Sequence, residues 1–470
     1  MDNSTPATAR RRYRQHRARA RAFVPVTRAL DLATLLHHHG HADVVYLVGP
    51  RPGRDVSGFS AWLAGPLPEG WASDGHYLAR LHRPVLRFAH RDGRRVEVHR
   101  ASAWFGEGDY APSQAGDALA LLDDALRASF DEHARALNTP ATTGRDLWLR
   151  SIPHGAEYPC LSDEHQQLIR STSGQGRWEL HHHGAETLPG LVGYDMRYGY
   201  AAMLWGLGVG PAVHDTVPEY AGQQRGRYRV RVTVPAGWRH VGLLPFAEDD
   251  GETWSYPSEP GRTFVTWADG AELHVAYAYG WDVAILERLL LVNGKPLDAW
   301  QTRMIDVRDR LLAQVRAGEA DVATATLAAD AARMCLLAAV GAFHGAPREV
   351  TRSSADVSMI PAGASGVDYS DAAWTWTETV AAAWPETVHP EWSAAVWARC
   401  RARLLTSRQS TGALHVAREN VIAMRQDGLY LTADPGWSDT GRVGAMRRTT
   451  VIDRPVLAPR TVADLLELVR

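Results

Sequence analysis

The sequence predicts an α+β fold in which a helical segment separates two regions of strands. Residues 226–234 alternate apolar and polar side chains, which is typical of a half-exposed strand. From about residue 283 to 345 the apolar spacing becomes helical, with little Gly or Pro. Strand character returns at 421–431, where an Asp-Gly pair between two apolar stretches predicts a β-hairpin.

Composition places the chain among globular proteins without a strong overall charge. Its 470 residues are 45% hydrophobic and 22% charged, and its net charge is −2. A nucleic-acid enzyme with this balance needs its arginines gathered along one groove. Lys295 is the only lysine among the 51 basic residues, which indicates a GC-rich coding genome, as in some bacteria, phages and plasmids.

The small number of cysteines and the lack of long apolar runs predict the cellular setting. Cys160, Cys335 and Cys400 are too dispersed for a disulfide framework or a thiolate zinc site, so we expect a cytoplasmic protein. We find no apolar run near the ~20 residues that span a bilayer, so no membrane partner is expected. Residues 1–22 form an Arg-rich arm that could grip a nucleic-acid backbone or simply be solvated.

The region before residue 165 is predicted to mix short strands and helices. Residues 44–48 and 95–99 have strand character, and 118–130 has the spacing of an amphipathic helix. Residues 139–144 are predicted to be a loop at a domain boundary. Residues 272–277 are expected to be a further strand, 283–292 a helix, and 346–370 a polar loop.

Two aspartates stand where a two-metal site could form. Asp195 ends an apolar strand, and Asp427 lies in the turn of the predicted hairpin. Carboxylates that bridge two Mg²⁺ ions serve phosphoryl transfer, because the metals activate the attacking oxygen and stabilise the leaving group. A structural interpretation is also open, since Asp-Gly is ordinary turn chemistry and Asp often caps a helix.

Four short segments carry a family resemblance through their order. They are Ser173-Gly-Gln-Gly-Arg177, Tyr194-Asp-Met-Arg-Tyr-Gly-Tyr200, Arg333-Met-Cys-Leu-Leu-Ala-Ala-Val-Gly341 and Arg425-Gln-Asp-Gly428. With helices between the second and the fourth, the series resembles that of the B-family DNA polymerases. It is most similar to the short protein-primed polymerases of phages and plasmids, over residues 165–450.

The first two segments resemble a template-contacting motif and the first palm motif. In the first, Ser173 replaces the family's tyrosine, and the resemblance implies that Gly176 and Arg177 bind nucleic acid. The second resembles Asp-x-x-Ser-Leu-Tyr-Pro. It implies that Asp195 binds metal and that Tyr200 lies beneath the sugar and excludes a 2′-hydroxyl.

The other two segments resemble the fingers motif and the last palm motif. Arg333 takes the place of the triphosphate-binding lysine, and Gly341 is retained, so both are expected to bind the nucleotide. In the hairpin, Asp427 matches the second aspartate of Asp-Thr-Asp-Ser, and Arg425 replaces the first. The lost negative charge predicts weaker metal binding, or binding at a later, substrate-bound step.

The resemblance implies a right-hand polymerase: a palm sheet, inserted helical fingers and a short or absent thumb. Beyond the hairpin, Arg447 and Arg448 are expected to grip the primer. No Asp-x-Glu strand precedes residue 160, so the N-terminal domain resembles a degenerate exonuclease domain. The expected boundaries are 1–22 for the basic arm, 23–165 for the N-terminal α/β domain, 166–282 and 346–450 for the palm, 283–345 for the fingers, and 451–470 for a thumb remnant.

The implied activity is that of a DNA polymerase without 3′–5′ proofreading. Asp195 and Asp427 would hold two Mg²⁺ or Mn²⁺ ions, and the partners would be primer-template DNA and dNTPs. Untemplated addition, protein-primed transfer with a priming protein, and a catalytically silent nucleic-acid-binding protein are open alternatives. The histidine runs 37–41 and 181–183 leave a metal hydrolase as a more distant one.

Overall fold

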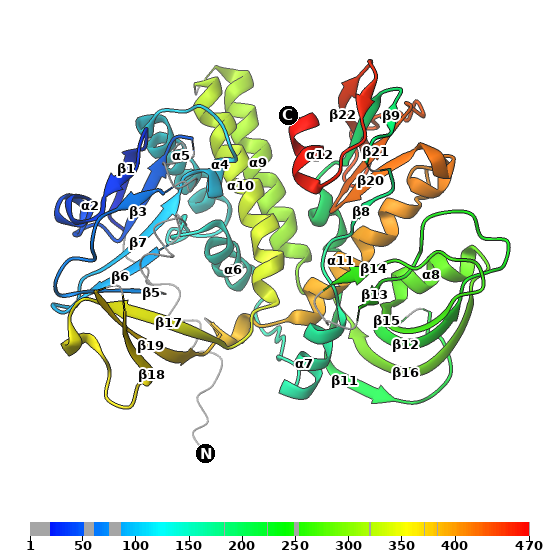
Figure 1. The fold of residues 1–470 in the computed structure, drawn as a ribbon, viewed down its shortest axis with the longest axis horizontal. Coiled ribbons are helices and arrows are strands. Elements are labelled where there is room, and N and C mark those ends of the chain that lie inside the picture. Colours follow the sequence, from blue (N-terminus) through cyan, green and yellow to red (C-terminus); the bar gives the residue numbers. More distant parts are fainter. Residues whose placement is uncertain are drawn as a thin grey trace. The chain divides into compact units, whose positions relative to one another are not determined.

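The chain forms two compact units (Figure 1). Unit 1 comprises Met1–Pro153 and Trp300–Pro385, and unit 2 comprises His154–Ala299 and Glu386–Arg470. The structure, a computed structural model, describes residues 19–50, 61–74, 86–182, 184–222, 224–248, 253–318, 321–370, 372–382 and 384–469. Most of the predicted basic arm, up to residue 18, therefore lies outside the described residues.

Unit 1 is built on an eight-stranded mixed sheet with the order β1-β3-β7-β6-β5-β17-β19-β18. Its strands are β1 (Arg21–Pro25), β3 (Val44–Val48), β5 (Trp71–Asp74), β6 (Leu86–His90), β7 (Arg95–Arg100), β17 (Arg348–Ser354), β18 (Ser365–Ser370) and β19 (Ala373–Val380). The apolar run of β3 is buried at every residue, as a central strand requires. A short pair, β2 (Leu30–Asp31) and β4 (Leu63–Ala64), accompanies the sheet.

The described part of unit 1 contains one long apolar helix, α10 (Val322–Phe343). Its other described α-helices are α2 (Leu32–His39), α4 (Ser102–Phe105), α5 (Pro112–Ser129), α6 (Pro140–Ser151) and α9 (Asp298–Ala317). Helix α10 packs against α4, α5 and α6, which lie beside it in Figure 1. It is long and apolar enough to cross a membrane, contrary to our sequence expectation, but half of its most apolar window is buried within the protein, as in a core helix.

Three expectations about this unit were wrong. Residues 348–354, 365–370 and 373–380 are strands of the unit 1 sheet, not palm, because β17 pairs antiparallel with β5 and extends that sheet. The predicted polar loop at 346–370 contains strands β17 and β18. The edge strand β18 is exposed throughout, so no apolar alternation marks it in the sequence. Residues 139–144 are not a loop, because Thr139 caps α6 and Pro140 opens it.

Unit 2 contains two larger sheets that share a hydrophobic core with two helices. The five-stranded sheet has the order β22-β10-β21-β20-β8, and the four-stranded sheet β11-β16-β12-β15. The strands are β8 (Trp178–Leu180), β10 (Leu191–Met196), β11 (Gly208–Asp215), β12 (Arg225–Thr233), β15 (Thr263–Asp269), β16 (Asp282–Asn293), β20 (Val421–Arg425), β21 (Gly428–Leu431) and β22 (Met446–Ile452). Residues of α8 (Gly270–Ala278) and α11 (Pro390–Leu405) join the core. A further helix, α7 (Asp163–Thr172), contacts α11.

Two elements of unit 2 differ from the prediction. The expected helix at 283–292 is strand β16, which pairs with both β11 and β12. Its leucine-rich run fits either period, and pairing on both edges selects the strand. The expected strand at 272–277 is helix α8, which begins at a capping box formed by Asp269 and Glu272.

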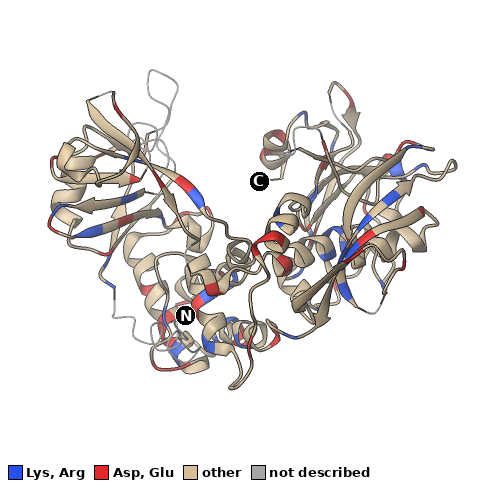
Figure 2. Ribbon diagram, turned by 90° about the horizontal axis from the view of Figure 1, so that it is seen from below, with Lys and Arg blue, Asp and Glu red and all other residues tan. Residues whose placement is uncertain are grey.

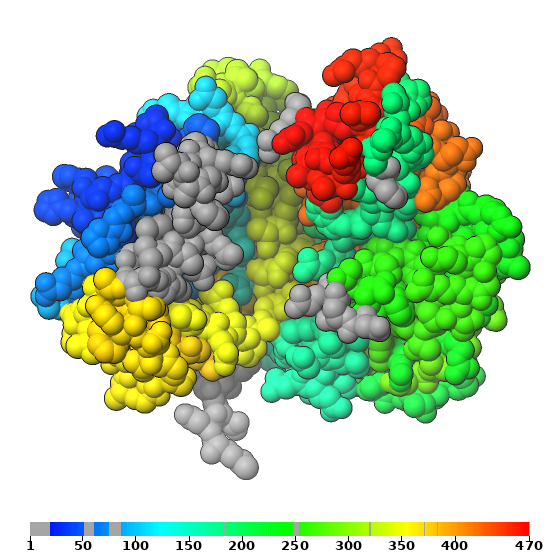
Figure 3. All heavy atoms as spheres, viewed as in Figure 1, coloured from blue at the N-terminus to red at the C-terminus, as the bar shows by residue number. Residues whose placement is uncertain are grey.

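The C-terminal residues pack on the five-stranded sheet of unit 2. Strand β22 is an edge strand beside β10, and β23 (Val456–Leu457) pairs with β9 (Thr187–Leu188). Leu465 of α12 (Val462–Leu468) is buried with Ile422 and Ala423 of β20. Figure 3 shows the red C-terminal residues against the green ones of the same unit. The predicted thumb remnant at 451–470 is therefore packed on the sheet.

Candidate active site

The structure brings Asp195 and Asp427 to the same end of the five-stranded sheet. Strand β10 lies between β21 and β22, so Asp195 faces Gly428 on one side and Arg447 on the other. The backbone N–H of Met196 donates to the carbonyl of Asp427 at 3.0 Å. The strand and the hairpin therefore pair as neighbours, with one half-buried aspartate on each.

The hairpin tip is held in a conformation that its sequence does not favour. Gln426 has a φ of +53°, which a residue with a side chain rarely adopts. Its N–H donates to the carbonyl of Arg177 at 2.8 Å, and its carbonyl accepts from the Cys400 thiol at 3.5 Å. These contacts on both sides of the tip offset the strain and position Asp427.

Gly199 makes room for the Asp427 carboxylate. A Cβ atom added at position 199 would lie 1.9 Å from Oδ2 of Asp427, closer than any non-bonded contact permits. Gly199 begins the short 3-10 helix η1 (Gly199–Met203), which follows Tyr198 in the left-handed region at φ +60°. The apolar residues 200–207 form only this short turn and not a longer helix.

Tyr200 and Gly176 lie together beside the hairpin tip. A Cβ atom at Gly176 would come within 2.8 Å of the Tyr200 hydroxyl and 3.3 Å of Cγ of Gln426. Burial raises the pKa of Tyr200, and the nearby Cys400 and Asp427 raise it further. The phenol therefore stays protonated at neutral pH and can donate a hydrogen bond.

The negative charges of Asp195 and Asp427 act on the same two side chains, Cys400 and Tyr430. Burial raises the pKa of Cys400 well above its ordinary value, and Asp427 and Asp195 both add to the shift. Burial likewise raises the pKa of Tyr430, again with contributions from both aspartates. Asp195 and Asp427 thus form one region of negative charge in unit 2.

The two carboxylates of Asp195 and Asp427 suit a divalent metal ion that is also bound by the substrate. No cluster of three or more His, Cys, Asp or Glu side chains able to bind a metal occurs among the described residues. Mg²⁺ does not require one, because it is commonly bound by one or two carboxylates together with substrate phosphates and water. Asp195 and Asp427 supply the oxygen ligands that such a site needs.

Arg425 places a cation beside this pair, on the strand that leads into the tip. Its guanidinium lies 4.8 Å above the ring of Trp178, in a cation–π contact. A side-chain hydrogen bond to Arg425 opposes the effect of burial on the pKa of Tyr430. The site is therefore less negative than one with an aspartate at position 425.

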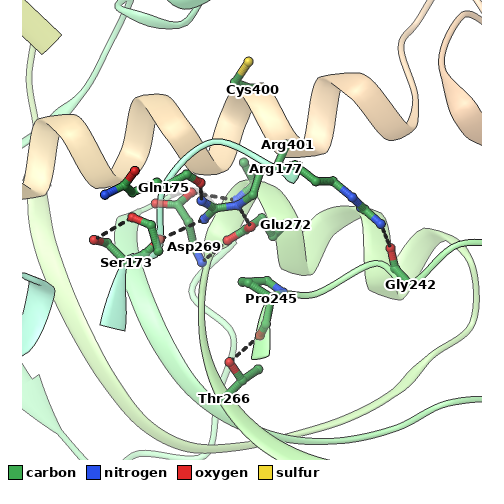
Figure 4. Close-up of polar contacts among 12 residues, drawn as sticks. Ser173, Gln175, Arg177, Gly242, Pro245, Thr266, Asp269, Glu272, Cys400 and Arg401 are labelled. Atoms are coloured by element: carbon green, nitrogen blue, oxygen red, sulfur yellow. Dashed lines mark hydrogen bonds and ion pairs between the residues drawn. The ribbon is translucent and has the colours of Figure 1, made fainter. Parts of the chain in front are cut away.

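Arg177 is an internal residue rather than a surface one (Figure 4). Its side chain is 0% exposed and forms an ion pair with Glu179. It donates to the carbonyl of Gly242 at 2.8 Å and lies 4.0 Å above the ring of Tyr256. Such burial does not fit the expected contact with nucleic acid, and it indicates a role in fixing the segment that supports Gln426.

Arg401 organises the same segment, and the sequence did not single it out. This buried arginine of α11 donates to the carbonyls of Ser173 and Gln175, and it ion-pairs with Glu272 of α8 at 2.7 Å (Figure 4). It thereby ties the segment before Gly176 to two helices. Four arginines between 399 and 408 resemble one another in sequence, so only burial distinguishes this one.

Arg447 and Arg448 lie on β22 in different settings. Arg447 is exposed and directly opposite Asp195, so both side chains are on the same face of the sheet. Arg448 forms an ion pair with Asp434, which also accepts a hydrogen bond from the Tyr194 hydroxyl. Arg447 is thus available to a ligand near the carboxylates, whereas Arg448 fixes the loop that precedes β22.

The remaining predicted site residues lie elsewhere. Arg333 and Gly341 are on α10 of unit 1, so their nucleotide-binding role stays a prediction. Of the histidines, His37 and His38 are exposed at the end of α2. His182 contacts the side chain of Glu186, and His183 lies outside the described residues.

Solved structures show which class of fold surrounds this site: it is DNA-polymerase-like. The complex of phi29 DNA polymerase with primer-template DNA and incoming nucleotides matches with a TM-score of 0.60 and 10% identity, over 93% of this chain and 86% of that one. The orthorhombic form of phi29 DNA polymerase matches with a TM-score of 0.58 and 11% identity, over 90% and 78%. Its complex with single-stranded DNA matches with a TM-score of 0.57 and 12% identity, over 90% and 78%.

Sequence comparison adds no relative to these structures. No protein-family model matches the chain, and no curated protein matches its sequence. At 10–12% identity, the structural likeness establishes the fold alone.

Proposed function

We propose that this protein is a DNA polymerase that extends a primer by metal-assisted phosphoryl transfer. The observation that carries the proposal is the pairing of Asp195 with the Asp427 hairpin, with the Asp427 carboxylate lying over Gly199. A polymerase-like fold around the pair supports it. The phi29 complexes also motivate the substrates, since those structures contain primer-template DNA and nucleotides.

Each site residue has a separate role in the proposed reaction. Asp195 and Asp427 would hold Mg²⁺ or Mn²⁺, which when bound neutralises phosphate charge and favours ionisation of the attacking hydroxyl. Tyr200 lies beneath the sugar, and Arg447 attracts the primer backbone. The role expected for Arg333 of α10, neutralising the triphosphate, stays a prediction. The primer 3′-hydroxyl gives its proton to water, and its oxygen bonds to the α-phosphorus as the bond from that phosphorus to pyrophosphate breaks.

Arg425 sets this polymerase apart from one with three palm aspartates. A permanent cation beside the carboxylates opposes metal binding through Coulomb repulsion. We therefore expect the ions to bind tightly only together with the nucleotide, whose phosphates restore the missing negative charge. The same feature favours the second candidate function, a silent nucleic-acid-binding protein.

Proofreading is not part of the proposed activity. None of the described strands of unit 1 carries an Asp-x-Glu pair, the pattern of a family exonuclease site. A primer with a mismatched 3′ end should therefore keep its length when incubated with protein and Mg²⁺ in the absence of dNTPs. Its shortening would contradict this part of the proposal.

Template-directed primer extension tests the main proposal. Four templates that differ only in the first unpaired base are each offered one dNTP at a time, with Mg²⁺ or Mn²⁺. We expect addition only of the complementary nucleotide. Addition regardless of template would show untemplated transfer, and DNA binding without extension would show a silent protein. Extension only in the presence of a protein primer would point to protein-primed synthesis.

A further inference from the structure

A cavity in unit 2 carries four arginines and is not the candidate active site. Its volume is about 870 Å³, and it lies among η1, the start of β12, helix α8 and the C-terminal part of α11. Neither Asp195 nor Asp427 lines it. The arginines are Arg225, Arg399, Arg403 and Arg408.

Acidic side chains balance only part of the positive charge of this cavity. Elsewhere in the two units, basic and acidic positions are interspersed along the ribbon (Figure 2). None of the ion pairs that join described residues includes any of the four arginines. Asp269 is the one carboxylate of the lining, and burial raises its pKa. The lining therefore has a surplus of positive charge.

Neutral acceptors engage two of the arginines without removing this surplus. Arg399 donates to the carbonyls of Met203, Trp205 and Gly206 at 2.6–2.9 Å, and Arg403 donates to that of Gly444 at 3.1 Å. The C-terminal end of α11 offers only about half a negative charge. Four guanidinium groups around one cavity thus repel each other unless an anion enters.

The pKa values of Arg399 and Arg403, the two more buried arginines, also reflect the surplus of positive charge. Burial lowers the pKa of Arg399; Asp269 and Asp298 oppose this shift, and Arg225 adds to it. Burial also lowers the pKa of Arg403, with Arg408 as the second cause. A bound anion would reverse both Coulomb effects.

We propose that this cavity binds a free nucleotide through its phosphates, at a site separate from that of the reacting dNTP. The volume suits a small molecule rather than an extended strand. Arg225 and Arg408 are exposed, and guanidinium groups bind phosphate in a bidentate way. Tyr220 and Tyr279 offer rings for a base, and Thr406 offers a hydroxyl.

Calorimetric titration with ATP and with inorganic tripolyphosphate in EDTA tests the proposal. EDTA removes the divalent metal on which nucleotide binding at the aspartates depends. We expect saturable binding of one ATP per chain. Arg225→Ala combined with Arg408→Ala should weaken it by about tenfold or more, since both groups donate charged hydrogen bonds.

Matched variants separate this cavity from general charge and from the aspartates. Arg231→Ala removes an exposed arginine from the same strand, β12, outside the cavity, and should bind ATP like the wild type. Asp427→Asn should also leave binding in EDTA unchanged. Because Arg408 is exposed, Arg408→Gln serves if the double variant fails to fold.

Three results would overturn the proposal. They are the absence of saturable ATP binding to the wild type, equal binding by the wild type and the arginine variants, and binding of a thymidine oligonucleotide at this cavity without binding of ATP. The last would identify a strand-binding groove instead. None of them bears on primer extension, so the outcome is independent of the polymerase proposal.

Discussion

The Asp427 carboxylate occupies the space that a side chain at position 199 would need. Gly176 plays a similar part for Tyr200, whose hydroxyl lies where a Cβ atom would project. Both glycines stand next to predicted functional residues in the sequence. Their spatial role depends on contacts with a hairpin more than two hundred residues away, which the sequence alone does not reveal.

Gly199→Ala should abolish the proposed nucleotide addition with little effect on folding. The added Cβ would lie 1.9 Å from Oδ2 of Asp427, so the carboxylate must move, and a 1 Å misplacement can cost about a hundredfold in rate. Primer extension and thermal melting check this. Gly237→Ala is the control, because a Cβ there meets no atom within 4 Å. Equal activity of both variants would contradict the described position of Asp427.

Arg177→Met tests whether this arginine supports the site or binds DNA. Removing it leaves Glu179 without its buried partner, which typically costs about 3–5 kcal/mol of unfolding free energy. Urea denaturation measures this cost. A variant of unchanged stability but weakened DNA affinity would favour the contact that the family resemblance implies.

At the scale of elements, residues 432–446 join the hairpin to β22 through two carboxylate contacts. Asp434 binds Tyr194 and Arg448, and Asp439 binds Arg197. Trp437 packs edge-on against Tyr194, with ring centroids 5.0 Å apart. This loop therefore depends on ionised aspartates next to the first palm motif.

Acid should loosen this loop before it unfolds the core. The hydrogen bond from Tyr194 is the main cause that lowers the pKa of Asp434 below its ordinary 3.8. The carboxylate thus stabilises the fold fully above about pH 3.8, and this contribution is lost as the pH falls through the lowered value. Amide exchange of the loop, corrected for intrinsic rates, should rise in that range in the wild type. In Asp434→Asn it should be fast already at higher pH, and an unchanged loop in that variant would refute the contact.

Sequence patterns predicted the elements that carry the two aspartates better than the other elements of unit 2. The hairpin at 421–431 and the strand that ends near Asp195 are confirmed, because Asp-Gly and short apolar runs are local signals. Strand β16 was predicted as a helix, since a leucine-rich run fits both periods until pairing decides. Helix α8 was missed although its capping box was visible at Asp269 and Glu272.

At the scale of the whole molecule, the polymerase-like fold was predictable from motif order, but the division into units was not. Strands β17–β19 follow the predicted fingers in sequence and yet complete the N-terminal sheet. Their pairing with β5 joins residues about 280 positions apart, with no local signal. Helix α10 likewise packs with α4, α5 and α6 of unit 1.

Calorimetry should resolve two unfolding transitions, one for each unit. Trp148→Ala empties a buried site against Phe343 in unit 1 and should cost that unit about 3–5 kcal/mol. Trp281→Ala, which removes a buried ring packed on Trp238, should lower the other transition. If either variant shifts both transitions equally, the chain unfolds as one body.

The single-turnover rate of nucleotide addition tests the central claim most directly. It is measured for the wild type, Asp195→Asn, Asp427→Asn and the control Asp282→Asn, an exposed residue at the start of β16. We predict that the two site variants lose at least about a thousandfold in rate, because metal ions contribute several kcal/mol to phosphoryl transfer, while the control keeps the wild-type rate. Addition at the wild-type rate by a folded Asp427→Asn protein would contradict it.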